Sequence, residues 1–481
     1  MVSKRMYRLF FAGLVILSGI AVVNAYASTP GSSADFSGKT QSQIRAETGA
    51  MVSPRDNITV IATDSNSWLG KEGSGPRARA ELVAFNPNGS ILYYNDTHTR
   101  YWDVDPVKGT KTTVEYSYAD HLNKSECPTS WNLTKRNVSQ KTWNTYMKVH
   151  GEVPACTRNG IDRVNLTTGK VTPIWSQITP GKEATRYHDV DRLDKNHFVV
   201  ADIFLDRVFI VNTTNGQVGW TWNVSDVYQP NKTGGEYPKD WSHINNVQAL
   251  KDGRIAVSIR NHDQVVFLKP GKGMLKNETL GKDDDHSILY EQHNPDYINE
   301  SNGGPAEVVA DSDNNRVIEY QRENGSWNQT WVWQDSKMQW PRDADRLPNG
   351  HTLITDSNGN RVFEVNEKGK IVWDVQIAFP YEAERLGTGD ESAGGPSAQK
   401  AGLKSKSNGF VTEFWIGVKD KMPGKYLNAL MYITPVWMGV PEVVAILISV
   451  LTLLVWGVVE LKWAGVFSTV RRRIESFNET R

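Results

Sequence analysis

Three histidines stand at matching places in successive repeated units of the chain. His188, His243 and His293 belong to consecutive units, and the whole chain holds only 10 histidines. Arg342 stands at the same place in the following unit. Converging imidazole and guanidinium groups are typical of a receptor for an anion such as sulfate or phosphate, because they supply charge-assisted donors. An imidazole with an open ring nitrogen can also act as a nucleophile.

Further hydrogen-bond donors lie beside two of these histidines. Asn245 follows His243 by two residues, so on a strand both side chains would point the same way. Arg260 is expected on the adjacent strand or its turn, and Gln292 directly precedes His293. The set contains no cysteine and requires no nearby carboxylate. These residue types therefore indicate an oxyanion receptor.

A metal site is the main alternative for three histidines. The charge of Arg260 beside them would repel a cation, so we expect neither a metal nor a cofactor. The chain has no phosphate-binding glycine motif and no Gly-x-Ser-x-Gly elbow, which leaves nucleotide binding and serine hydrolysis unsupported. The Asp- and Asn-rich runs that begin at Asp311 and Asp356 lack the spacing of a calcium loop, and we interpret them as turns.

The segments that must position these side chains form a repeat. The four residues are spaced 55, 50 and 49 apart, and each unit holds short apolar runs separated by Gly, Asn and Asp. Most units close on a tryptophan-bearing run, such as the one with Trp220 and Trp222. A period of about 50 residues with roughly four strands is typical of a propeller blade. Two earlier units fit between Arg77 and Trp175, so we predict an all-β, six-bladed β-propeller over residues 76–386.

The composition agrees with a β-rich protein that does not bind nucleic acid. The 481 residues include 54 Lys and Arg against 54 Asp and Glu, so the net charge is zero and the basic excess of a nucleic-acid binder is missing. The 39 Gly, 17 Trp and 17 Tyr favour strands and tight turns over helical bundles.

Both ends of the chain carry membrane signals. Lys4, Arg5 and Arg8 precede an apolar run over 9–23 and an Ala-x-Ala-like site, so residues 1–27 form either a cleaved signal peptide or a retained anchor. Residues 28–75 are an N-terminal extension and residues 387–435 a linker. We predict a transmembrane helix over residues 436–463. Residues 464–481, which include Arg471 to Arg473, form a basic tail. The positive-inside rule puts that tail in the cytoplasm and the propeller outside.

An exterior location fits two further features. Asn-x-Ser/Thr sequons recur between Asn57 and Asn328, so we expect N-linked glycans. Cys127 and Cys156 are the only cysteines, and a pair outside the cell favours one disulfide over two free thiols.

Three motifs, in this order, resemble the arylsulfate sulfotransferase family. They are Asp240-Trp-Ser-His-Ile-Asn-Asn, Ser258-Ile-Arg-Asn and Tyr290-Glu-Gln-His, and His188-Asp-Val fits an earlier element. The resemblance covers roughly Ala78 to Trp373. It implies a six-bladed propeller that transfers a sulfuryl group from a phenolic sulfate ester to a phenol, without a nucleotide sulfate donor. The anchored chain would be an archaeal-type, membrane-bound member.

The resemblance also implies roles for the residues singled out above. His293 would be the nucleophile that forms a sulfohistidine, and His188, His243, Asn245 and Arg260 would hold the sulfate oxygens. His243 or His188 would protonate the leaving phenolate. Their places in the repeat add Arg342 and Gln292 to the substrate-binding set.

The chain departs from this family in two respects. Only about 50 residues precede the blades, where bacterial members carry a β-sandwich domain, and Asn-Pro-Asp follows His293. Two other functions therefore stay open: a non-catalytic surface propeller that binds glycans or proteins, and a quinone-dependent dehydrogenase suggested only by the tryptophan repeats.

Overall fold

The computed structural model describes residues 3–27, 36, 39–65, 79–152, 155–466, 468–470 and 472. They fall into two compact units, one made of residues 32–433 and the other of residues 1–31 with 434–481. The basic tail residues Arg471 and Arg473, like Arg77 at the expected start of the blades, lie outside the described residues.

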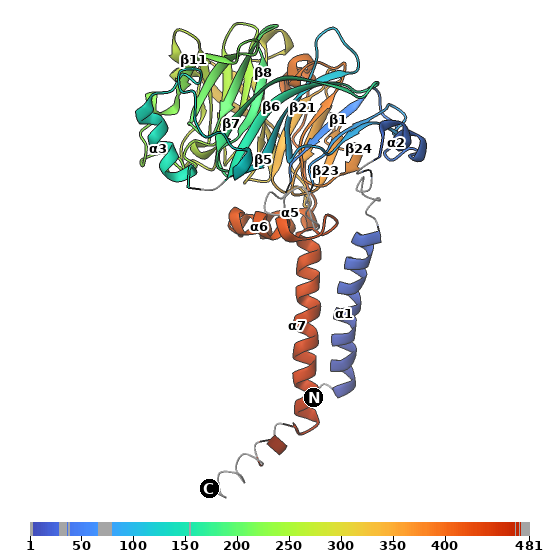
Figure 1. Cartoon of the computed structure of the whole chain (residues 1–481). Coiled ribbons are helices and arrows are strands. Elements are labelled where there is room, and N and C mark those ends of the chain that lie inside the picture. The colour runs from blue at the N-terminus through green and yellow to red at the C-terminus, as the bar shows by residue number, and fades with distance from the viewer. Residues whose placement is uncertain are drawn as a thin grey trace, which may run out of the picture. The chain divides into compact units, whose positions relative to one another are not determined.

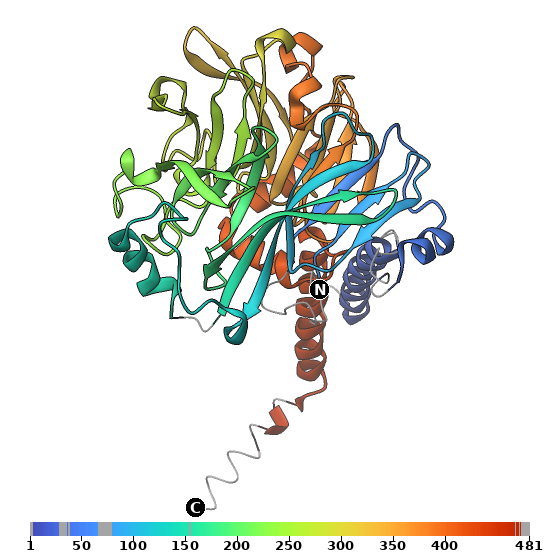
Figure 2. The ribbon, with the colours of Figure 1, turned by 45° about the horizontal axis from the view of Figure 1, so that its top comes forward.

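Six antiparallel sheets make up the larger unit, and they are arranged around one axis (Figures 1 and 2). Neighbouring inner strands contact one another all the way round, which closes the ring. The predicted six-bladed, all-β propeller is confirmed. The first three blades, inner strand first, are β25 (Pro380–Arg385), β1 (Thr59–Thr63), β2 (Leu82–Phe85) and β3 (Ile91–Asn95); β4 (Arg100–Pro106), β5 (Thr113–Asn123), β6 (Ala155–Asn165) and β7 (Lys170–Pro180); and β8 (Tyr187–Arg192), β9 (His197–Asp202), β10 (Arg207–Asn212) and β11 (Gln217–Asn223).

The remaining three blades follow in chain order, and the fourth carries an extra short strand. They are β12 (Ile244–Ala249), β13 (Ile255–Ile259), β14 (Gln264–Lys269) and β15 (Gly273–Met274) with β16 (Leu280–Gly281); β17 (His293–Ile298), β18 (Ala306–Asp311), β19 (Arg316–Glu323) and β20 (Ser326–Trp333); and β21 (Pro341–Arg346), β22 (Thr352–Asp356), β23 (Arg361–Val365) and β24 (Ile371–Gln376).

The first blade joins the two ends of the propeller sequence. Its inner strand β25 pairs with β1, so a strand that follows the sixth blade completes the first one. This pairing leaves no open sheet edge between the ends of the ring, which stabilises closure. The expected start at residue 76 is therefore wrong, because β1 at Thr59–Thr63 already belongs to a blade. This strand is short, and residues 66–78 separate it from β2, so the repeat pattern does not extend to it.

Tryptophans of the outer strands are buried between neighbouring blades, as the repeat predicted. Trp222 of the third blade packs against Ile244 and Val257 of the fourth. Trp333 of the fifth blade packs against Ile354 and Phe363 of the sixth. Large apolar rings of this kind supply much of the burial energy that holds one blade against the next.

Segments outside the blades also pack on the propeller. Helix α2 (Gln41–Glu47) begins at a Thr40 capping box, and α3 (Gln140–His150) lies within a long insertion of the second blade. The predicted disulfide between Cys127 and Cys156 is present and ties that insertion to β6.

Residues 387–435 are not an extended linker. They form η6 (Glu391–Gly394), α4 (Ala398–Ala401), α5 (Phe410–Asp420) and α6 (Gly424–Ile433). Ser392, Ala398 and Leu427 are at most 1% exposed. Glycine- and serine-rich composition suggested a linker, but apolar and hydrogen-bonding contacts to the blades order this segment.

The smaller unit contains two long apolar helices. Helix α1 (Lys4–Ala27) and helix α7 (Val440–Trp463) are each 24 residues long and apolar enough to cross a membrane. They run antiparallel, because Arg8 pairs with Glu460 at 2.6 Å near one end and Tyr26 contacts Trp437 near the other. Two such helices are compatible with the predicted membrane anchoring.

Candidate anion site on the propeller axis

A β-bulge or similar irregularity interrupts every inner strand near its start. In each of the six blades the pairing between the inner strand and its neighbour skips a residue near the start of the inner strand, and such bulges re-aim side chains. In blade order, the skipped residues are Tyr381, Trp102 with Asp103, His188, Asn245, Asn294 with Pro295, and Arg342.

This register corrects the alignment of the three histidines. His188 is a bulged residue of its inner strand, and the residues at the equivalent position of the next two blades are Asn245 and Asn294. His243 and His293 come earlier in their blades, before the bulge. The histidines still converge, because the chain enters the inner strands through residues with positive φ. His243 has φ +46°. Non-glycine residues pay about 1–3 kcal/mol for such backbone, a cost that recurs at functional sites.

His293 is held in one tautomer. Its Nδ1 lies 3.1 Å from the Glu291 carbonyl oxygen and 2.8 Å from the Ser312 hydroxyl oxygen, while that hydroxyl donates to the Pro341 carbonyl. A carbonyl only accepts, so Nδ1 carries the proton. Nε2 keeps its lone pair and has no hydrogen bond within the part of the chain described. Burial, together with the positive charges of Arg342 and Arg260, lowers the pKa of His293 and keeps the imidazole neutral.

His243 supports Arg260. Its Nδ1 donates to Asp240 Oδ1 at 2.6 Å, and its Nε2 accepts from Arg260 Nη1 at 3.2 Å. Burial and the Arg260 charge lower the pKa of His243 to about 4. Both ring nitrogens are thus occupied in a neutral ring. Arg260 lies in η3 (Arg260–His262), directly after β13, and also pairs with Glu291 at 3.4 Å.

His188 leaves its second nitrogen unpaired. Its Nδ1 hydrogen-bonds to the Tyr381 hydroxyl at 2.9 Å, its ring stacks on Trp102, and its Nε2 is buried with no hydrogen-bond partner in the described structure. The His188 and His243 rings are 5.1 Å apart, and the His293 ring lies 6.2 Å from Tyr381. Tyr381 therefore lies between the histidines.

Two arginines of the site share a carboxylate. Arg342 Nη1 donates to Asp64 Oδ2 at 3.0 Å, and Arg100 Nη1 donates to Asp64 Oδ1 at 2.9 Å. The guanidinium of Arg342 is further stacked against Trp340, Phe379 and Tyr381, with its carbon 4.3–4.8 Å from their ring centres.

Arg186 differs from these arginines because only the more distant carboxylates of Asp64 and Asp240 balance its charge. Among the described residues its side chain makes no ion pair and no hydrogen bond; its Nε is buried, and its guanidinium lies 5.5 Å from the Trp102 ring centre. Burial and repulsion from Arg100 lower the pKa of Arg186 to about 10, so it remains charged at neutral pH. A half-buried guanidinium without a direct partner among the described residues, two positions before His188, is an indication of an anion site.

Asn245 and Gln292 connect the fourth and fifth blades. Asn245 Nδ2 donates to the Gln292 carbonyl at 2.8 Å, and Gln292 Nε2 donates to Ser258 and to the Gln264 carbonyl. His243 lies just before β12 and Asn245 is the bulged residue of that strand, so the regular alternation assumed for this pair does not apply to them.

Arg186, Tyr381 and Trp102 were not predicted as site residues from the sequence. A signal for two of them exists, since Trp-Asp-Val-Asp at 102, His-Asp-Val-Asp at 188, Arg-Asp-Ala-Asp at 342 and Tyr-Glu-Ala-Glu at 381 share one pattern. The first residue of each is a bulged residue. Arg186 stands outside any repeated motif, and only the fold brings it to the axis.

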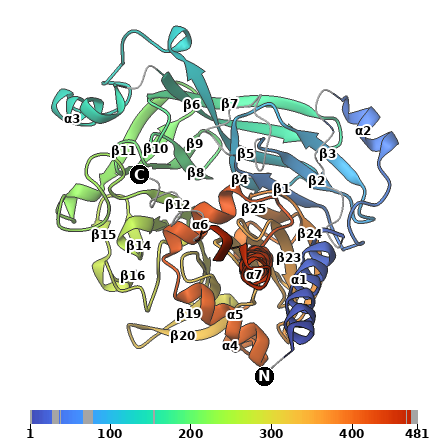
Figure 3. The same cartoon turned by 90° about the horizontal axis from the view of Figure 1, so that it is seen from below.

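Helix α6 covers this end of the axis. Asn428 of α6 donates to Asp313 at 3.0 Å and accepts from Gln339 at 2.8 Å, and Tyr432 donates to the Ser65 carbonyl at 3.2 Å. Figure 3 shows α5 and α6 across the middle of this face. His188, His243, His293 and Arg342 are 1–5% exposed, so an anion bound among them is shielded from bulk water.

Comparison with known proteins supports the family named above. Residues 222–378 match the family model described as Arylsulfotransferase (ASST). The match covers less than half of the chain and includes His243, Arg260 and His293, whereas Arg186 and His188 precede it. No curated protein matches this chain.

Solved structures resemble the chain only distantly. A putative 6-phosphogluconolactonase from Bacteroides uniformis has 12% identity and a TM-score of 0.41 over 69% of this chain and 99% of its own. The periplasmic gluconolactonase PpgL of Pseudomonas aeruginosa has 11% identity and a TM-score of 0.39, covering 69% and 100%. A virginiamycin B lyase from Staphylococcus aureus has 8% identity and a TM-score of 0.36, covering 69% and 88%.

Proposed function

We propose that this protein is a membrane-anchored sulfotransferase that moves a sulfuryl group from an aryl sulfate ester to a phenolic or other hydroxyl acceptor. The observation that carries the proposal is the fixed tautomer of His293, which directs a neutral Nε2 lone pair into a cationic surrounding. The arylsulfotransferase match over residues 222–378 supports the same reaction class.

In the first half-reaction, His293 Nε2 attacks the sulfur of the ester. The S–N bond forms while the bond between sulfur and the aryl oxygen breaks, and the electron pair leaves with the phenolate. His188, with its proton on Nε2 and its Nδ1 accepting from the Tyr381 hydroxyl, protonates the phenolate. His243 has both nitrogens engaged with Asp240 and Arg260, so it positions Arg260 instead.

In the second half-reaction, the acceptor hydroxyl attacks the sulfur of the sulfohistidine. The S–O bond forms, the S–N bond breaks, and His188 takes the proton from the acceptor. Arg186, Arg260 and Arg342 stabilise the negative charge on the sulfuryl oxygens in both steps. No nucleotide donor and no cofactor takes part in this scheme.

The defining experiment uses 4-nitrophenyl sulfate as donor and a phenol as acceptor. We expect nitrophenol release that depends on the acceptor, with ping-pong kinetics, because two half-reactions share one intermediate. Nitrophenol release should be measured by absorbance and the sulfated acceptor by mass spectrometry. If the pure protein releases nothing over a broad panel of aryl sulfates, the alternative of a glycan- or protein-binding surface propeller replaces this proposal.

We also propose that α1 stays in the mature protein as a second anchor, with both chain ends cytoplasmic and the glycosylated propeller outside. Three contacts to α7 support retention: Arg8 with Glu460, Phe11 with Trp456, and Tyr26 with Trp437. The ion pair satisfies two charges that would be costly within a membrane.

Intact-mass measurement and N-terminal sequencing of the protein from its native membranes test this proposal. We expect a mature chain that still contains Lys4 and Arg8. A mature N-terminus after Ala27 would instead identify residues 1–27 as a cleaved signal peptide.

A further inference from the structure

A second cluster on the propeller axis is acidic, and the sulfotransferase scheme does not use it. The residues that follow the bulges on the inner strands are mostly Asp and Glu, and η6 adds Glu391. One carboxylate oxygen from each of Asp296, Asp343, Asp345 and Glu391 lies within 4.8 Å of the others. We propose that these four residues bind a divalent cation with oxygen ligands, and that this cation is Ca²⁺.

Two of the four carboxylates, those of Asp343 and Asp296, also have a structural role. Asp343 Oδ2 accepts from the Ala383 amide at 3.1 Å, which links β21 to β25. Asp296 Oδ2 accepts from the Ser392 hydroxyl at 2.6 Å, which links β17 to η6. These bonds hold the acids in place and use only one oxygen of each.

The remaining oxygens point to a ligand. Oδ1 of Asp343 and Oδ1 of Asp345 are buried without a hydrogen-bond partner among the described residues. The carboxyl groups of Asp296 and Glu391 hydrogen-bond to each other. The three aspartates are at most 2% exposed. Asn294 also has one bonded atom and one oxygen without a partner. Its Nδ2 donates to Glu382 at 3.0 Å, while its Oδ1 is buried and has no hydrogen-bond partner among the described residues.

The basic residues on the same strands do not neutralise these acids. Arg346 of β21 pairs with Glu319 at 3.0 Å, and Arg385 of β25 pairs with Glu364 at 3.1 Å. Buried carboxylates this close repel one another unless a cation or protons compensate them. Bound Ca²⁺ would supply the compensating charge and the missing partners together.

The ligand chemistry selects Ca²⁺ among metals. Ca²⁺ takes about 6–8 oxygen ligands at roughly 2.3–2.6 Å, so ligands on opposite sides of the ion are about 5 Å apart, and four oxygens that all lie within 4.8 Å of one another can contact a single ion. Transition metals prefer imidazole or thiolate, and none of the four residues offers either. The expectation of no metal concerned the three histidines and overlooked these acids.

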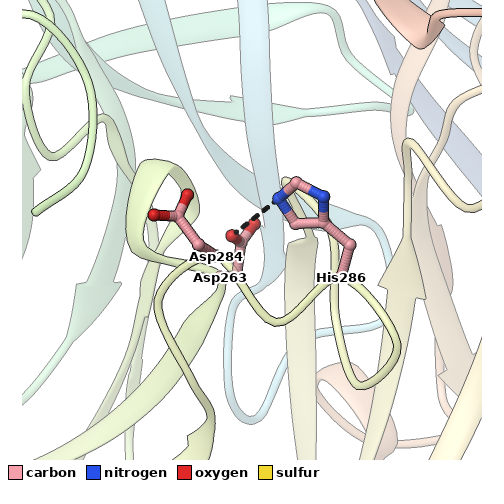
Figure 4. Close-up of side chains that lie close together, drawn as sticks. All are labelled: Asp263, Asp284 and His286. Atoms are coloured by element: carbon pink, nitrogen blue, oxygen red, sulfur yellow. Dashed lines mark ion pairs between the residues drawn. The ribbon is translucent and has the colours of Figure 1, made fainter.

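Another acidic group is less suited to an ion. Asp263, Asp284 and His286 lie close together on loops of the fourth blade, and His286 pairs with Asp263 at 3.4 Å (Figure 4). Asp263 already accepts from the Glu291 amide at 2.9 Å, and Asp284 and His286 are exposed to water. We interpret it as a surface ion pair, and Asp284 provides a matched control.

Calorimetry and thermal unfolding of the full chain, purified in detergent and treated with EDTA, test the proposal with Ca²⁺ alone. We expect one Ca²⁺ per chain and an unfolding midpoint about 5 °C higher at 100-fold excess over Kd. Asp345→Asn and Asp343→Asn should each weaken Ca²⁺ binding at least about 10-fold and, at the same Ca²⁺ concentration, reduce the rise in midpoint to about half or less. Asp284→Asn should behave as the wild type.

The wild-type isotherm alone can decide the question if an axial variant does not fold. No Ca²⁺ binding at millimolar concentration would overturn the proposal and leave carboxyls that share protons. Wild-type affinity in both Asp343→Asn and Asp345→Asn would overturn it as well. Neither outcome depends on sulfotransferase activity, so this proposal and the proposed function can fail separately.

Discussion

His293→Asn is expected to lower kcat for nitrophenol release by at least about 10³-fold, because no nitrogen lone pair remains to attack sulfur. Asparagine is short and polar, and its amide N–H can still donate to Ser312, which now holds His293 Nδ1 at 2.8 Å. We therefore expect the fold to survive. Steady-state kinetics and a thermal unfolding curve measure the two effects.

Labelling gives the nucleophile a direct signature. With an aryl sulfate and no acceptor, mass spectrometry of the wild type should find one added sulfuryl group on the peptide containing His293. His150 is a matched control, because it is a 5% exposed histidine in α3, and His150→Asn should keep activity. Undiminished turnover in His293→Asn would refute the nucleophile assignment.

Arg186→Met is expected to lower kcat/KM by about 10²–10³-fold while leaving the unfolding midpoint unchanged or higher. The guanidinium has no direct ion pair or hydrogen bond in the described structure, and only the more distant Asp64 and Asp240 balance its charge, so its removal breaks no contact and relieves a partly desolvated charge. Its loss also removes a charge-assisted donor to the sulfuryl oxygens, for which costs of this size are typical. A residue with a purely structural role would not combine lower activity with equal or higher stability.

Arg207 in β10 is the matched control for Arg186. It is 2% exposed and pairs with Asp202 at 2.8 Å. Arg207→Met should destabilise the fold by about 3–5 kcal/mol, because it leaves Asp202 buried and unpaired. Added sulfate should raise the midpoint of the wild type and of Arg207→Met, but not that of Arg186→Met. A normal sulfate response in Arg186→Met would contradict a role of Arg186 in anion binding.

Periodicity was enough to predict the propeller. Strand-turn-strand units with a period of about 50 residues recur because each blade must bury both faces against its neighbours, and burial leaves apolar residues at regular places. The same regularity located His188, His243, His293 and Arg342 near one axis. It did not reveal β1, because a five-residue strand separated from its blade carries too little pattern.

The periodic pattern could not predict which residues of the site occupy equivalent positions in their strands. A bulge adds a residue without changing the apolar alternation that follows it. The sequence pattern therefore aligned His188 with His243, whereas in the structure His188 and Asn245 occupy equivalent positions of their blades. Asn245, the bulged residue of its strand, donates to the carbonyl of Gln292, the residue that directly precedes His293.

By itself, the amino-acid sequence determined the fold class, the two apolar helices, the disulfide and the residue types of an anion site. Only the tertiary structure decided which groups lack a partner. Arg186 Nε, His188 Nε2 and Oδ1 of Asp343 and Asp345 lack a hydrogen-bond partner among the described residues because inner strands from different blades meet at the axis. The neighbours of each group come from residues far apart in the chain, so a local sequence pattern cannot predict them.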